Sequence, residues 1–155
     1  MEDIIVRKAK INDYDDIIRL YKQLYDAEKV FDDNLKKDFK IGDKEEIKIK
    51  KKIKSRKDIF LVAELGGKIV GLIDGVIIEN ILHKEKVAYL DHVCVDEKHR
   101  RKAIGTKLID EFSERAKLKG AKFIKLNAFE NNIKAVNLYK KYGFAEYSIF
   151  YMKKM

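Results

Sequence analysis

A short basic segment in the middle of the chain combines residue types that can hold a diphosphate. An apolar strand and a polar turn precede three basic residues, which are followed by small ones in the run Arg100-Arg101-Lys102-Ala103-Ile104-Gly105-Thr106. The small residues are expected to open an amphipathic helix, and the first N–H groups of a helix are unpaired and carry the positive end of its dipole. Because small side chains let a ligand approach that backbone, the segment predicts a binding site for a diphosphate.

The same segment resembles the acetyl-CoA loop of the GNAT superfamily of N-acetyltransferases. The fingerprint of that loop is Arg or Gln, two residues, Gly, one residue, and Gly or Ala. It starts here at Arg100, and Ala103 stands where the family usually has its first glycine. An alanine is tolerated at that position wherever the backbone keeps a negative φ angle.

A second segment, nearer the C-terminus, resembles another GNAT motif: Asn, two residues, Ala, two residues, Leu-Tyr, three residues and Gly-Phe. The run Asn132-Ile133-Lys134-Ala135-Val136-Asn137-Leu138-Tyr139-Lys140-Lys141-Tyr142-Gly143-Phe144 matches every fixed position. Asn132 is also expected to cap the helix that follows it. The resemblance implies acetyl-CoA binding by residues of both segments, which are Val93, Cys94, Val95, Arg100, Arg101, Lys102, Ala103, Ile104, Gly105, Thr106, Asn132 and Tyr139.

In the family, the strand equivalent to Val87–Val95 splays from its neighbour at a bulge. The pantetheine amides of the cofactor pair with the freed backbone, as an added strand would. The resemblance makes the main chain of Val93 and Val95 the candidate for these contacts, which are compatible with side chains that pack in the core.

Tyr139 is the candidate proton donor. A phenol has a reference pKa of about 10, so at neutral pH it holds a proton that it can give to a departing thiolate. The resemblance places this position against the sulfur of the cofactor. The alternative is a core tyrosine on an apolar helix stripe.

Asp91 is the candidate proton acceptor, and His92 competes with it. Alternation along the strand places Asp91 on the face opposite His92 and Cys94. A carboxylate in a partly dry cleft can accept a proton directly or through water. The imidazole of His92 has an ordinary pKa close to neutral. A purely structural aspartate is the other interpretation of Asp91.

The composition is that of one domain spanning residues 1–155, with 46% hydrophobic and 39% charged residues. No apolar run approaches the ~20 residues of a membrane span, and the N-terminus lacks the order of a signal peptide, so we expect a cytoplasmic protein. Cys94 is the only cysteine, which excludes an intramolecular disulfide. Three scattered histidines give no zinc-site spacing, and we expect no metal.

The net charge of +9 raises the question of nucleic-acid binding. Much of the excess lies in one lysine-rich stretch, residues 48–57. That stretch has no aromatic residue on which bases could stack, which favours the solvated face of a short helix. We therefore expect neither a nucleic-acid partner nor a membrane, and a homodimer stays open.

The expected elements follow in the order β-α-α-β-β-β-α-β-α-β(β). The expected strands are Ile4–Ala9, Ile59–Leu65, Ile69–Ile78, Val87–Val95 and Phe123–Phe129, with one or two more in Phe144–Met152. A nucleotide-binding doubly wound fold would alternate strand and helix more regularly and place a glycine-rich turn after its first strand. The fold class is thus α/β (α+β), and the resemblance implies a mixed, mostly antiparallel central sheet with helices on both faces.

These observations favour an acetyl-CoA-dependent N-acetyltransferase that acts on a primary amine by direct attack in a ternary complex. No base is arranged to make Cys94 an acyl-enzyme nucleophile. The acceptor stays open between a small amine and a protein or peptide. Acidic residues that could receive it, or that are only solvated, are Asp26, Glu28, Asp32, Asp33, Asp38, Asp74 and Asp91. The alternative function is a non-catalytic acyl-CoA-binding or basic interaction module.

Overall fold

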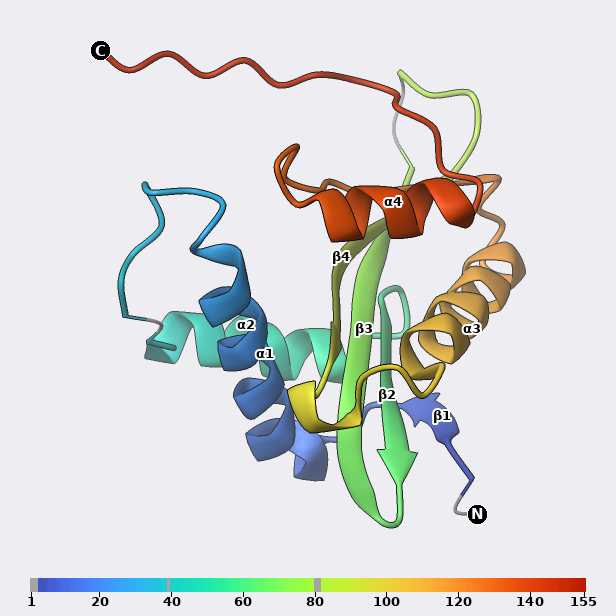
Figure 1. The fold of residues 1–155 in the computed structure, drawn as a ribbon. Helices are drawn as coiled ribbons and strands as arrows, with labels where there is room; N and C mark the ends of the chain where they lie inside the picture. The colour runs from blue at the N-terminus through green and yellow to red at the C-terminus, as the bar shows by residue number, and fades with distance from the viewer. Residues whose placement is uncertain (1–2, 39, 80–81) are drawn as a thin grey trace.

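A mixed five-stranded sheet runs through the centre of the protein (Figure 1). The computed structural model describes residues 3–38, 40–79 and 82–155. The strands lie in chain order across the sheet and are β1 (Ile5–Lys8), β2 (Ile59–Leu65), β3 (Lys68–Ile78), β4 (Val87–Val95) and β5 (Phe123–Lys125). Neighbours from β1 to β4 are antiparallel, whereas β4 and β5 are parallel. A crossover helix between β4 and β5 makes the parallel pairing possible.

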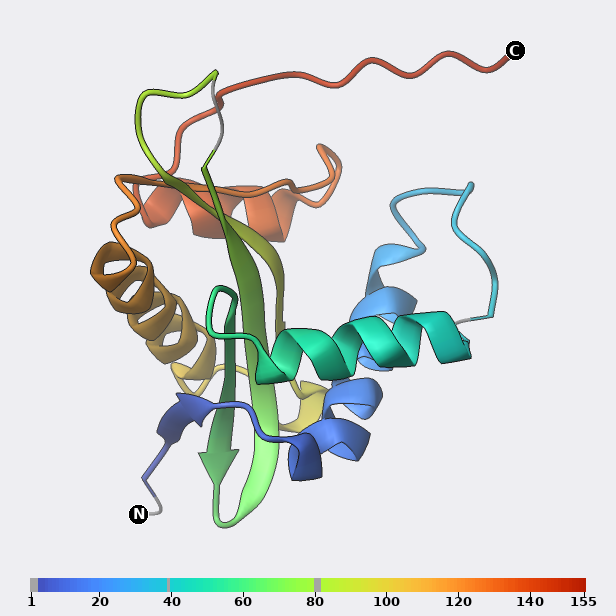
Figure 2. The same ribbon diagram turned by 180° about the vertical axis from the view of Figure 1, so that it is seen from behind.

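Four helices surround this sheet, and they are α1 (Tyr14–Glu28), α2 (Asp43–Lys54), α3 (Ile104–Leu118) and α4 (Ile133–Lys141). The helices α1 and α2 lie on one face of the sheet, and α3 lies on the other (Figures 1 and 2). The fourth helix, α4, crosses the end of the sheet at which β4 begins. The expected arrangement of helices on both faces is confirmed.

Two apolar layers fix these helices to the sheet. On the α3 face, Leu108 and Phe112 are fully buried in one cluster with side chains of β2, β3 and β4. On the opposite face, Ile17 and Leu20 of α1 pack in a second cluster that also contains Cys94. Since β3 and β4 are covered on both sides, their apolar side chains alternate between the two layers.

The expected bounds of two strands, Ile59–Leu65 and Val87–Val95, are those of the structure. The strand expected over Phe123–Phe129 ends at Lys125, and the final strands expected in Phe144–Met152 are wrong. The last residues extend away from the sheet (Figure 1), and the side chain of Tyr147 is 77% exposed. Strand propensity favours an extended backbone, but a strand also needs a partner edge to pair with.

Among the described residues, no helix is long and apolar enough to cross a membrane. No group of three or more histidine, cysteine or acidic side chains in that part of the chain could hold a metal ion.

Candidate functional site

The outer edge of β4 is paired along only part of its length. Its first residues, Val87–Tyr89, pair with β5. Beyond Tyr89, the edge that faces away from β3 has no strand partner in the described ranges. The backbone polar groups on that stretch are not bonded to a second outer strand, so a ligand can lie alongside it as a strand would.

A β-bulge interrupts the other edge of β4 at the same place. Asp74 of β3 pairs with His92, but the next residue, Gly75, pairs with Leu90, so Asp91 is an extra residue without a partner. A Cβ atom on Gly75 would lie 2.2 Å from the carbonyl oxygen of Tyr89, which only a glycine avoids. The bulge bends the strand and changes which way its side chains point.

The expectation that Asp91 and His92 point to opposite faces is therefore wrong. Lys52 of α2 binds both Asp74 and Asp91, with distances from its Nζ of 2.7 Å and 2.5 Å, and His92 binds the same Asp74. All of these side chains lie on the face covered by α1 and α2. The physical reason is the bulged residue, because one inserted residue breaks the period-two alternation.

Asp74 is the centre of this cluster, and its side chain is 1% exposed. It accepts hydrogen bonds from Tyr21 Oη at 3.0 Å and from Lys52 Nζ at 2.7 Å, and His92 Nδ1 lies 2.8 Å from its second oxygen. Burial raises the pKa of Asp74, but the bonds and charges of His92 and Lys52 outweigh burial and lower the pKa below its usual value. Asp74 is thus an ionised, buried acceptor.

His92 is held by two contacts and stays half-open to solvent. Besides its bond to Asp74, the ring packs edge-on against Tyr21, with centroids 5.1 Å apart. Burial lowers the pKa of His92, but the hydrogen bond and charge of Asp74 prevail and raise the pKa above its ordinary value. Its side chain is 46% exposed, so the ring edge away from Asp74 is accessible.

Glu28 connects this cluster with α4. Burial raises the pKa of Glu28 above its ordinary value, and the nearby charge of His92 opposes that shift. Burial, with the charge of Glu28 added, also raises the pKa of Tyr139. Tyr139 therefore keeps its proton at neutral pH, and its ring contacts Phe144 edge-on at 5.7 Å. The carboxyl of Glu28 is within electrostatic reach of both His92 and Tyr139.

The N-terminus of α3 is open and basic. Ala103 occupies the N-cap position without a capping hydrogen bond from its side chain, and the first turn of the helix has no acidic residue. Arg101 and Ala103 have φ angles of 63° and 57°, so the condition of a negative φ at Ala103 is not met. Arg100 folds back, and its Nε donates to the carbonyl oxygen of Val95 at 3.2 Å. The basic loop thus lies directly against the open end of β4.

Asn132 and Cys94 have the local roles that the sequence indicates. The Oδ1 atom of Asn132 accepts a hydrogen bond from the backbone N–H of Ala135 at 3.2 Å, which confirms the helix cap. The thiol of Cys94 is buried and lies 3.4 Å from the carbonyl oxygen of Leu20. Burial raises its pKa to about 11, so the thiol stays protonated, in agreement with a cysteine that is no nucleophile.

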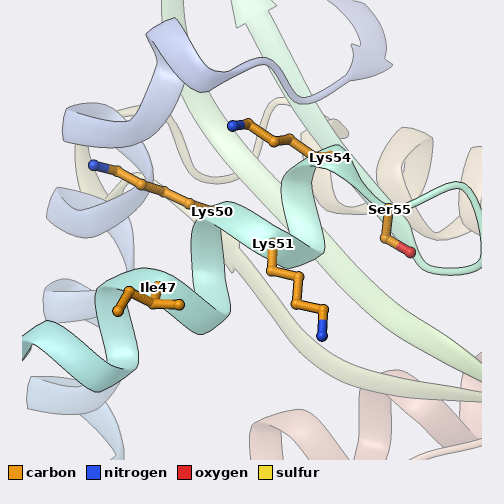
Figure 3. A pocket seen from close by; sticks show the side chains of 5 residues that line it. All are labelled: Ile47, Lys50, Lys51, Lys54 and Ser55. Atoms are coloured by element: carbon orange, nitrogen blue, oxygen red, sulfur yellow. The ribbon is translucent and has the colours of Figure 1, made fainter.

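The lysine-rich helix α2 presents a shallow hollow to solvent (Figure 3). Its lining residues are Ile47, Lys50, Lys51, Lys54 and Ser55. The lysine side chains do not converge on one point. Lys50 instead pairs with Glu46 at 2.5 Å and lies over the ring of Tyr14. Such divergent ammonium groups are typical of a solvated helix face and form no built anion site.

Two residues of the cluster, Tyr21 and Lys52, have no functional assignment from the sequence, and Asp74 is expected there only as one of several acidic residues that could receive the amine. The signal for Asp74 was present, because it is the only charged residue in the apolar run Ile69–Ile78. A charge at such a position is buried and needs partners. Tyr21 and Lys52 carried no such signal, since one belongs to an apolar helix stripe and the other to a run of lysines.

The chain belongs to the acetyltransferase (GNAT) family, whose model matches residues 17–144. The family and the fold class predicted from the sequence are thereby confirmed.

Two curated relatives agree with this assignment. The chain is 34% identical over 143 residues to an uncharacterized N-acetyltransferase of Methanocaldococcus jannaschii, a match that covers 91% of this chain and 60% of that protein. It is 36% identical over 63 residues to a spermine/spermidine N(1)-acetyltransferase of Bacillus subtilis, covering 40% of this chain and 41% of that protein. The matches thus span less than two thirds of the length of either relative.

Solved structures share the fold. A mutant of the BH1408 protein from Bacillus halodurans has a TM-score of 0.87 at 20% identity, with 97% of this chain and 99% of that chain covered. An aminoglycoside acetyltransferase from an uncultured soil sample, in complex with trehalose, has a TM-score of 0.75 at 25% identity, with 98% and 95% covered.

Proposed function

We propose that this chain transfers an acetyl group from acetyl-CoA to a primary amine by direct attack in a ternary complex. The observation that carries the proposal is the contact between the basic loop and the open end of β4. The Arg100 side chain bonds to Val95, so a ligand whose diphosphate binds at the loop has its pantetheine arm beside the free strand edge. Acetyl-CoA supplies the activated acetyl thioester.

The residues present fit this cofactor at both ends. The free N–H groups of α3, with the exposed side chains of Arg100, Arg101 and Lys102, suit the diphosphate. The backbone of Val93 and Val95 suits the amides of pantetheine, and Cys94 between them contributes main chain only. In the first turn of α3, Ile104 is buried, while Gly105 and Thr106 leave the backbone approachable. Asn132 keeps its side-chain N–H group free for the cofactor, because its Oδ1 makes the cap.

Tyr139 is the proton donor in this proposal. Its raised pKa means that the phenol is protonated when the carbon–sulfur bond breaks, and the sulfur can then take the phenolic proton. Its position in the second family motif supports a location near the thioester. Asp91, the proton-acceptor candidate from the sequence, is held by Lys52.

The acceptor in this proposal is a small cationic amine. Glu28 is a half-buried carboxyl that faces the cluster and has no ion-pair partner among the described residues. Other acidic residues near it are engaged elsewhere, since Asp26 binds Lys29 and Asp32 accepts from the backbone of Asn34. The partial match to a polyamine acetyltransferase and the likeness to an aminoglycoside acetyltransferase support an acceptor with several amino groups.

Thiol release from acetyl-CoA, screened against polyamines, aminoglycosides, amino acids and peptides, tests the proposal. We expect release only with an amine present and in equal amount to the acetylated product. CoA at ~100 times its dissociation constant should also stabilise the fold by about 2.7 kcal/mol. If CoA stabilises the fold but no amine leads to thiol release, the chain is a non-catalytic acyl-CoA-binding module and no enzyme. Stabilisation by duplex DNA or ATP instead of CoA would contradict both.

A further inference from the structure

We propose that His92, positioned by Asp74, is the group that accepts the proton of the attacking amine. The inference rests on the proposed acetyl transfer and adds the proton acceptor, which the sequence leaves open between Asp91 and His92. It is drawn from the hydrogen bonds around Asp74, the bulge at Asp91 and the exposure of the imidazole ring.

The hydrogen bonds of Asp74 determine which nitrogen of His92 carries the proton. An ionised carboxylate only accepts hydrogen bonds. Since Asp74 is buried with Tyr21 and Lys52 as donors and stays ionised, the bond to His92 requires a proton on Nδ1. The neutral ring then has its lone pair on Nε2. This second nitrogen has no hydrogen-bond partner in the described part of the chain, and the ring is 46% exposed.

The same contacts make Asp91 a poor proton acceptor. Its carboxylate is 2.5 Å from Lys52 Nζ, and Lys52 is held in turn by Asp74. A proton on Asp91 would have to displace a salt bridge that is partly buried, because the side chains of Lys52 and Asp91 are 20% and 27% exposed. A free lone pair on an imidazole needs no such displacement.

The position of His92 is fixed before any substrate binds. The bond to Asp74 sets the ring orientation, and the edge-on contact with Tyr21 restricts its rotation. His92 immediately precedes the stretch of β4 proposed to bind pantetheine. Glu28 interacts electrostatically with both His92 and Tyr139, so one carboxyl influences the proposed proton acceptor and the proposed proton donor.

The proton balance of the step is closed. The cationic amine first loses its ammonium proton to solvent. The neutral nitrogen then forms a bond to the acetyl carbon and gives one further proton to Nε2 of His92. The carbon–sulfur bond breaks, and the sulfur takes the proton of the Tyr139 hydroxyl. A proton then passes through solvent from the imidazolium to the phenolate, so both residues return to their starting states.

Several charged and titratable groups contact His92 or interact with it electrostatically. They are Tyr21 and Glu28 on α1, Lys52 on α2, Asp74 on β3 and Asp91 on β4. Asp74 is the group that stabilises the imidazolium most. A base works only when neutral, so activity should rise with pH through a midpoint above the ordinary value of about 6.5. Removing the charge of Asp74 should move that midpoint to lower pH.

The test combines a measurement on the free protein with variants. Nitrogen NMR of the histidine rings should show that neutral His92 carries its proton on Nδ1. The same titration should show that the pKa of His92 lies above the ordinary value for a histidine. His92→Gln should lower kcat/KM by ~10²–10⁴-fold, as loss of a general base does. The matched variant His83→Gln, in the loop after β3, should keep wild-type activity. Asp74→Asn should shift the acid limb of the pH profile to lower pH, while Asp91→Asn should retain a limb set by His92.

The outcomes separate the two proposals. If the wild type releases no thiol with any amine, the proposed function fails, while the NMR result still reports on the Asp74–His92 pair. The assignment of His92 is overturned if the wild type is active and His92→Gln keeps the wild-type rate. It is also overturned if Asp91→Asn alone abolishes the acid limb of the pH profile. A neutral ring protonated on Nε2 would overturn it as well, even where Asp74→Asn fails to fold.

Discussion

The two halves of β4 differ in almost every structural respect. In the first half, Val87–Leu90, the strand is bonded to neighbours on both edges over most of its length, and Ala88 and Leu90 are buried. In the second half, Asp91–Val95, a bulge interrupts one edge and the other has no strand partner in the described ranges. The first half holds the sheet together. In the second half, the outer backbone edge is not paired with a strand and the ring of His92 is partly exposed, so a ligand can contact both.

This difference shows how one strand can support both stability and chemistry. A regular strand buries its polar backbone in ladders and leaves nothing for a ligand. The bulge turns Asp91 and His92 toward the same helices, and the missing neighbour frees the outer edge. Substitutions in and around the two halves of β4 are therefore expected to have different effects.

Tyr139→Phe should have the largest effect if the open half of β4 is where the thioester lies. The ring and its contact with Phe144 are kept, but the proton to be donated is lost, so kcat should fall by ~10²–10⁴-fold. Melting temperature and CoA affinity should hardly change. Tyr142→Phe, at the end of the same helix but packed toward the α3 layer, is the matched control. Near-normal kcat for Tyr139→Phe would make Tyr139 a packing residue.

Glu28→Gln should weaken the binding of a cationic amine. Hydrogen bonds to charged groups are worth about 1.5–3 kcal/mol, which corresponds to roughly 10–100-fold in KM for a cationic amine. The control Asp26→Asn removes an exposed carboxylate that is paired with Lys29 and should change KM little. Equal effects of the two substitutions would point to a diffuse surface charge in place of a specific contact. Steady-state kinetics with a polyamine measures both.

Gly75→Ala should break the bulge from the β3 side. The added Cβ would approach Tyr89 at 2.2 Å and Phe112 at 2.8 Å. Overpacking of this kind costs about 1–3 kcal/mol or more, visible as a lower midpoint of denaturation. Gly105→Ala is the contrast, because its Cβ would meet Val95 at an ordinary 3.7 Å inside a helix. Wild-type stability for Gly75→Ala would mean that the bulge tolerates a side chain.

Ala103→Gly should have the smallest effect and the opposite sign. A left-handed backbone costs a non-glycine residue about 1 kcal/mol, so the glycine variant should be more stable by a similar amount. CoA affinity should stay equal or improve. In Ala135→Gly, where the backbone is helical, the same change should destabilise by about 1 kcal/mol. A loss of stability or a large loss of CoA affinity in Ala103→Gly would contradict the loop geometry.

The regular parts of the fold could be predicted from the sequence, whereas the irregular ones could not. Apolar runs bounded by turn residues gave the limits of β2 and β4 because burial on both faces leaves a strong pattern. The bulge at Asp91 left no such mark, since two adjacent polar residues look the same whether or not one is inserted. The positive φ of Ala103 was hidden because only a glycine or asparagine would have indicated it.

The sequence proposes candidate residues where they belong to a local motif and does not propose them where tertiary contacts bring them together. The loop at Arg100 and the motif at Asn132 are each local in the sequence, so their residue spacing is enough to predict a role in cofactor binding. The cluster around Asp74 joins residues from α1, α2, β3 and β4 that no local pattern connects. Glu28 did carry a signal, because an acidic residue in the last turn of a helix opposes the helix dipole and suggests another role.

A titration of the isotopically labelled protein with CoA, followed by backbone amide NMR, tests whether the open half of β4 binds the cofactor. We expect saturable shifts at Val93 and Val95 and in the first turn of α3, residues 104–106. We expect little change at Ala88 and Leu90 in the paired half of the same strand. Shifts confined to the lysine-rich helix α2, or spread equally over both halves of β4, would contradict the claim that the open half binds the cofactor.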